Sequence, residues 1–135
     1  MQEFIDMAMK SLGTDEKTTR GATGGLLNLI QKNADGGDFQ QLLQKLPGAD
    51  SLMKEGPSPG GGLGGAIGGL VGGLTGGNDA AKAIGALGFL TESGIDAGKI
   101  AQLVPMFLNF VKGKAGQDLL SKLLGKVPEL AKLAS

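Results

Sequence analysis

The chain has 135 residues, with 13 basic and 13 acidic side chains and no His, Cys, Trp or Tyr. This composition removes the usual general acid–base residue, the thiolate nucleophile, the soft metal ligands and any disulfide. Because the net charge is zero and aromatic residues are scarce, we expect no nucleic-acid partner. The length suits one domain or two very small units.

Helical periodicity begins at the start of the chain. Apolar residues predict a helix over 2–12, with Gly13 as its left-handed stop. Thr14 is the expected cap of a second helix that extends to about Asn33. This helix carries three glycines that either weaken it or mark a close helix crossing. They are Gly21, Gly24 and Gly25.

A third helix, over 39–46, is expected to follow a turn at Asp35-Gly36-Gly37-Asp38 and to end at Pro47-Gly48. Asp50 is the expected cap of one short helical turn over 51–54. The Asp-Gly-Gly-Asp sequence also suggests a cation-binding loop, but its spacing differs from that of an EF-hand and no Glu closes it. A turn that ends in a helix cap explains it better, so no metal site is predicted.

Residues 56–78 are the most unusual part of the chain. Eleven of the eighteen residues from 60 to 77 are glycine, and no residue between Glu55 and Asp79 is charged. Pairs of glycines recur every fourth residue and alternate with aliphatic residues, a period that a purely flexible linker does not need. Such a period is typical of a helix that packs closely on another helix. No Gly-Lys-Ser/Thr sequence ends the run, so a phosphate-binding loop is not predicted.

Three interpretations of this segment stay open: a linker, a glycine-packed helix used for self-association, and a membrane-inserted segment. As a helix, its eleven glycines cost roughly 9–11 kcal/mol relative to alanine. Full burial of five aliphatic side chains offsets roughly 8–15 kcal/mol of this. We therefore expect a helix here only against a partner surface. The predicted packing residues are Gly65, Gly69, Gly73, Leu63, Ile67, Leu70 and Leu74.

Beyond the Gly-rich segment the periodicity is again helical. Asp96 is the expected cap of the most apolar helix, and Pro105 inside it is expected to kink the helix rather than end it. Pro128 suits the first turn of a last short helix. The expected elements are helices from 79 to Gly94, around 100–111, around 119–124 and over 129–134, with a turn at 113–116.

The two halves of the chain show a weak internal repeat. When residues 13–54 are aligned with 94–135 at a constant shift of 81 positions, ten of the forty-two positions are identical and no gap is needed. A shared Gly-x-Asp at the start and Lys-apolar-Pro near the end favour a common design. We therefore predict one all-α domain of two pseudo-repeated three-helix units, residues 1–55 and 79–135, docked across the Gly-rich segment, 56–78.

Several short sequences occur in a distinctive order. They are Leu-Gly-Thr-Asp-Glu at 12–16, the glycine-rich entry at 21–27, Asp38-Phe39 before Leu46-Pro47-Gly48, the Gly/Leu middle and Val104-Pro105 before the turn at 113–116. In this order they resemble a bacterial domain family of unknown function, typified by the VcgC/VcgE proteins, over most of residues 10–127. The resemblance implies a helical fold and often an exported protein. It implies no activity and supplies no catalytic residues.

The start of the chain bears on localisation. Met1-Gln2-Glu3 is acidic and no apolar stretch follows, so no signal peptide is expected. We expect an exported protein, periplasmic or extracellular, if the chain is a mature form, and a cytoplasmic protein otherwise.

These residue types predict neither an enzyme nor a cofactor. The first functional hypothesis is a structural or interaction protein that self-associates through the Gly-rich segment, with itself or another protein as partner. The second is a module that binds an apolar ligand between the helical halves, in a pocket lined by Leu103, Met106 and Phe107 near Pro105. The third is a membrane- or surface-active protein that uses residues 60–77.

Overall fold

The structure, a computed structural model, describes residues 1–57, 87–127 and 130–131. Over these residues the chain forms helices and no strand, so the predicted all-α class is confirmed. The elements in chain order are α1 (Gln2–Leu12), α2 (Glu16–Asn33), α3 (Gly36–Lys45), α4 (Ala49–Glu55), the 3₁₀ helix η1 (Gly88–Ser93), α7 (Ala97–Ala115) and α8 (Gln117–Lys126).

The first helix has the predicted bounds, but the cap of the second differs from the prediction. Gly13 ends α1 with φ +67°. Asp15, not Thr14, is the N-cap of α2, and its carboxylate accepts a hydrogen bond of 2.8 Å from the backbone N–H of Thr18. A side chain on the residue directly before the helix is the one that reaches this N–H. Thr14 instead shares a 2.6 Å hydrogen bond with the hydroxyl of buried Thr19.

The next two helices begin earlier than predicted. The expected turn at 35–38 is wrong, because α3 already begins at Gly36, directly after Asp35. Asp38 therefore lies in the first turn of α3, where the partial positive charge of the helix end favours a carboxylate. The predicted cap at Asp50 is also wrong. Gly48 precedes α4 with φ +90°, a conformation that glycine adopts without strain, so the helix begins at Ala49.

In the second half, the described chain resumes at Leu87. The segment before Gly94 is the 3₁₀ helix η1 rather than an α-helix, and Gly94 ends it as predicted, with φ +100°. α7 is continuous through Pro105 and extends beyond the predicted end, since Gly113 lies within it. The predicted turn at 113–116 is thus reduced to Gly116.

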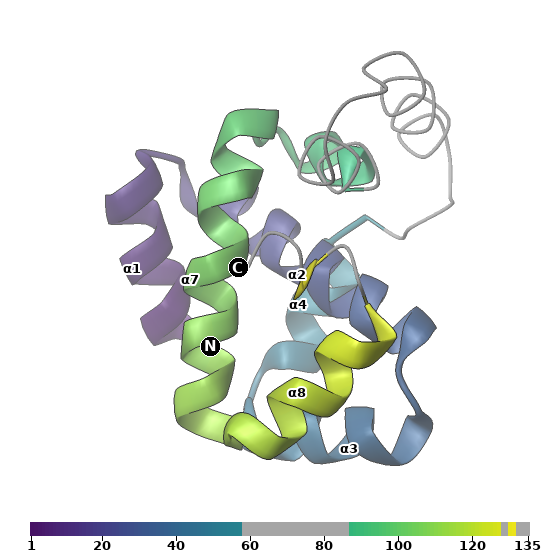
Figure 1. Cartoon of the computed structure of the whole chain (residues 1–135). Helices are drawn as coiled ribbons and strands as arrows, with labels where there is room; N and C mark the ends of the chain where they lie inside the picture. Colours follow the sequence, from purple (N-terminus) through teal and green to yellow (C-terminus); the bar gives the residue numbers. More distant parts are fainter. Residues whose placement is uncertain (58–86, 128–129, 132–135) are drawn as a thin grey trace.

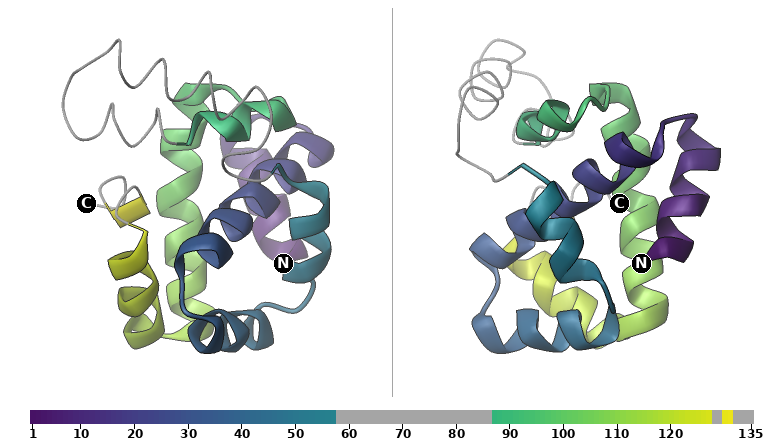
Figure 2. Two further views of the ribbon diagram at one scale, coloured as in Figure 1. Left: turned by 90° about the vertical axis from the view of Figure 1, so that its right-hand side faces the viewer. Right: turned by 180° about the vertical axis from the view of Figure 1, so that it is seen from behind.

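Helix α2 lies at the centre of the described fold, and Figures 1 and 2 show how the other helices surround it. It contacts α1, α3, α4, α8 and η1, while α7 is flanked by α1, α3 and α8. One hydrophobic core runs through both halves of the chain. Within it Phe4 of α1 packs edge-on against Phe107 of α7, with ring centroids 5.7 Å apart.

Local geometry recurs between the two halves at the shift of 81 residues used in the sequence alignment. α2 and α7 begin at equivalent positions, and α3 and α8 both begin and end at equivalent positions. Leu46 and Val127, which follow α3 and α8, share ψ 78° and each donates its N–H to two carbonyls of the preceding turn. These correspondences support the internal repeat. The two three-helix units themselves stay a prediction, because η1 matches only the end of α1 and residues 128–129 and 132–135 are not described.

Candidate functional site

The candidate site is the side of α2 formed by Gly21, Gly24 and Gly25, here called the α2 glycine face. Spacings of three and four residues put these glycines on one side of the helix, where α4 and η1 pack (Figure 2). A Cβ atom at Gly24 would overlap the carbonyl oxygen of Leu52 in α4, and one at Gly21 would lie 2.8 Å from the Cβ of Ser93. Of the two interpretations of these glycines, the structure therefore shows the close helix crossing.

Residues that flank the segment 58–86 on either side lie against Gly25. A Cβ atom at Gly25 would overlap the side chain of Leu90 and would lie 3.2 Å from the ring of Pro57. Pro57 is the last described residue before the segment, and Leu90 follows closely on Leu87, the first described residue after it. The α2 glycine face therefore contacts described residues both before and after this segment.

Asn28 continues this side of α2 and holds the outgoing chain. Its Nδ2 donates to the carbonyl oxygens of Met53 at 3.0 Å, Pro57 at 3.1 Å and Gly56 at 3.4 Å. The last carbonyls of a helix have no partner within the helix. The Asn28 amide thus supplies the donor that the end of α4 and the chain beyond it need.

Asn28→Asp is expected to lower the free energy of unfolding by about 1–3 kcal/mol, because a carboxylate would offer acceptors alone to these carbonyl oxygens. Asn109 is the matched control, since it occupies the equivalent position of α7 and is exposed. Asn109→Asp should stay within about 0.5 kcal/mol of the parent. Urea unfolding followed by circular dichroism measures both. Equal losses in the two variants would contradict the role given to the Asn28 amide.

An ion pair lies beside the contact between α2 and α4. The Nε and Nη2 atoms of Arg20 donate to the two carboxylate oxygens of Glu55, each at 2.8 Å. These hydrogen bonds lower the pKa of Glu55 and raise the pKa of Arg20. Hydrogen bonds from Thr18 likewise lower the pKa of Asp15. Each shifted pKa therefore has a structural cause, either a helix cap or a bond between helices.

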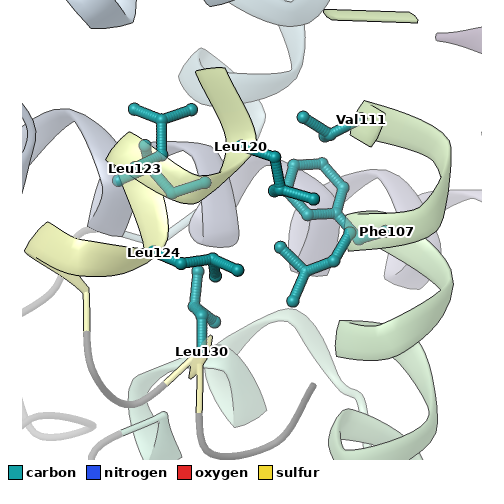
Figure 3. A pocket seen from close by; sticks show the side chains of 8 residues that line it. Phe107, Val111, Leu120, Leu123, Leu124 and Leu130 are labelled. Carbon is teal, nitrogen blue, oxygen red and sulfur yellow. The ribbon is translucent and has the colours of Figure 1, made fainter. Parts of the chain in front are cut away.

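The residues of the predicted apolar pocket are only partly brought together. Leu103 and Phe107 are fully buried, and Met106 is partly buried against the core. Figure 3 shows an apolar space between α7, α8 and Leu130, toward which Phe107 points. Leu103 and Met106 do not line it, and the described side chains leave no room in it for a water-sized molecule. Its lining consists of Ile30, Phe107, Leu108, Val111, Leu120, Leu123, Leu124 and Leu130.

The residues predicted to mediate self-association lie outside the described residues. They are Gly65, Gly69, Gly73, Leu63, Ile67, Leu70 and Leu74. Among the helices that the structure does describe, none combines the length and the hydropathy needed to cross a bilayer. Over the same residues, no three carboxylates gather as metal ligands.

Asn28 was not among the predicted site residues. Two signals were present in the sequence. Asn28 follows Gly24 and Gly25 at helical spacing, and it is one of the identical positions of the repeat, paired with Asn109. A polar residue that continues a glycine face indicates that backbone carbonyl groups of the segment packed there need a hydrogen-bond donor.

Comparison with known families extends the resemblance found in the sequence. The profile of the family described as "Protein of unknown function VcgC/VcgE (DUF2780)" matches residues 1–127. No curated protein and no solved structure matches the chain. The match spans both helical halves and the Gly-rich segment between them, and its description assigns no activity.

Proposed function

The chain belongs to the VcgC/VcgE family of unknown function, and from this premise we propose that it is a non-catalytic helical protein that self-associates through its Gly-rich segment. The proposal rests on the contacts made by the residues that flank that segment. Pro57, directly before the segment, and Leu90, shortly after it, both lie against Gly25 of the central helix. A rigid base of this kind suits an element used for contact with another molecule.

The composition of the segment supports contact with a second copy. Its period-four glycines allow the backbones of two helices to approach closely, and its aliphatic residues need a partner surface for burial. The same segment in a second copy supplies matching glycines and aliphatic residues. Because the segment has no charged residue, two copies of it do not repel each other.

The structural roles of two described carboxylates support the proposal of a non-catalytic protein. Asp15 caps α2, and Glu55 binds Arg20 across two helices. Both groups accept hydrogen bonds that hold the fold together, and these bonds lower the pKa of Asp15 and of Glu55.

The test is the absolute mass of the native protein, measured by light scattering after size exclusion over a wide range of protein concentration. We expect a defined oligomer whose share rises with concentration. A combined replacement of Gly65, Gly69 and Gly73 with Leu should give a monomer, because bulky side chains hold two helix backbones apart. A parent chain that stays monomeric at every concentration would contradict the proposal.

A control variant separates close packing from added hydrophobicity. It replaces Gly37, Gly113 and Gly125 with Leu, at three exposed helical positions where a Cβ atom would meet nothing within 4 Å. This variant should associate as the parent does. If it became monomeric as well, the effect of the first variant would not be due to the Gly-rich segment.

A further inference from the structure

The two halves of the described structure pack on each other reciprocally. α1 of the first half lies against α7 of the second, and η1 of the second half lies against α2 of the first (Figure 1). Likewise α3 contacts α7, and α8 contacts α2. At the shift of 81 residues α2 corresponds to α7, α3 to α8, and η1 to the end of α1. The contact of α1 with α7 is thus matched by that of η1 with α2, and the contact of α3 with α7 by that of α8 with α2.

The surface that each half presents to the other is the hydrophobic core itself. Phe4 is fully buried, and its ring centroid lies 5.7 Å from that of Phe107 and 5.4 Å from that of Phe110. In the opposite direction, Leu90 is fully buried and lies against Gly25. Either half by itself would expose this apolar surface to water, so each half requires a partner of this shape.

Charge favours an unlike half as the partner. Residues 1–55 carry six basic and eight acidic side chains, whereas 79–135 carry seven basic and five acidic ones. Glu3 forms an ion pair with Lys114 at 3.4 Å and Asp35 forms one with Lys126 at 4.0 Å, and each pair joins one half to the other. Such exposed pairs add little free energy and are screened by salt. They nevertheless favour the pairing of a first half with a second half. Two first halves, or two second halves, would have net charges of the same sign.

We propose that the unlike half can come from a second copy of the chain, so that residues 1–57 of each copy dock on residues 87–131 of the other. This exchange is possible because both pairs of halves in the dimer would reform the contacts that the halves make in the monomer. Tethering within one chain typically gives an effective concentration of roughly millimolar. Exchange therefore competes when chains fold together near that concentration. The interface is the one between halves, so the inference goes beyond association through the Gly-rich segment.

The chain has no cysteine, which makes a clean cross-linking test. Glu3→Cys and Lys114→Cys are prepared as two separate full-length variants, and both positions are exposed. The two are mixed, unfolded in denaturant, refolded together and treated with a short bismaleimide. When the chain concentration is near millimolar, covalent heterodimers should account for roughly a quarter of the protein. About half of the chains then exchange halves, and random pairing makes half of the exchanged dimers heterodimers. The same mixture without unfolding should stay at background.

Each variant refolded by itself is the matched control, because chance encounters would also link Glu3→Cys chains to one another. Asp35→Cys with Lys126→Cys forms a second, independent pair in case the first pair impairs folding. Heterodimers no more abundant than the single-variant products, for both pairs, would overturn the proposal. The triple leucine variant of the Gly-rich segment should still exchange halves. Association through the Gly-rich segment and exchange of halves are therefore tested by different experiments, and one can be contradicted without the other.

Discussion

Replacing Gly24 with Ala should cost about 3 kcal/mol or more of unfolding free energy. The added Cβ atom would overlap the carbonyl oxygen of Leu52, would lie 2.6 Å from the carbonyl carbon of that residue and would lie 3.1 Å from the amide nitrogen of Gly56. These are backbone atoms, so no change of rotamer relieves the overlap and α4 must move away from α2. Chemical denaturation followed by circular dichroism measures the loss.

The same substitution at an open helical glycine should have the opposite sign. Gly113 in α7 and Gly125 in α8 have nothing within 4 Å of an added Cβ atom. Gly→Ala there should raise the unfolding free energy by about 0.5–1 kcal/mol, because alanine loses less backbone entropy in a helix. A Gly24→Ala protein as stable as these controls would show that α2 and α4 do not cross as closely as described.

Phe107→Ala should cost about 3–5 kcal/mol, since it removes a fully buried aromatic ring and leaves a cavity between the halves of the chain. Phe107 packs edge-on against Phe4 and also lines the apolar space between α7 and α8. A domain of this size is typically stable by about 5–15 kcal/mol in total. The variant should therefore unfold at a much lower denaturant concentration, and a shift in the urea midpoint at constant slope would measure it.

Phe110 provides the matched comparison, because it lies one turn further along the same helix and is only partly buried. Its ring contacts Phe4 and lies 5.6 Å from the Nζ atom of Lys114. Phe110→Ala should cost about 1–2 kcal/mol, in proportion to its partial burial. Similar losses for the two variants would mean that the core is not centred on Phe107.

Much of the fold follows from local sequence signals. The helix over 2–12, the stops at Gly13 and Gly94 and the end of α2 at Asn33 are all as predicted. At these positions, apolar residues recur at helical spacing. The helix then ends where a glycine adopts positive φ or where this recurrence of apolar residues stops. Such signals act within one helical turn and do not depend on tertiary contacts.

The starts of helices were less predictable, for a physical reason. Thr14 and Asp15 are adjacent residues that both make good caps, and propensity alone does not choose between them. The structure uses Asp15 as the cap because Thr14 bonds to Thr19 instead. Similarly, Asp50 resembles a cap, but the left-handed Gly48 lets α4 begin before it. In both cases a contact or a backbone turn outside the local pattern decides the boundary.

The close crossing at the α2 glycine face was predicted only as one of two interpretations, and its residues were not predicted as a functional site. Glycines at positions 21, 24 and 25 indicated either a weak helix or a close crossing, and composition does not distinguish the two. The deciding fact is the position of Leu52 and Gly56 against Gly24, a contact between residues far apart in the sequence. The predicted packing residues of the Gly-rich segment lie outside the described residues, so their role stays a prediction.

The α2 glycine face also has a consequence for the order of folding. Glycines at positions 21, 24 and 25 each disfavour an isolated helix by about 1 kcal/mol relative to alanine, and a lone helix of this length is marginal even with good helix formers. α2 therefore gains its helical structure when α4 and η1 arrive to cover it. Because η1 comes from the second half of the chain, the central helix of the first half is completed only after most of the protein has been synthesised.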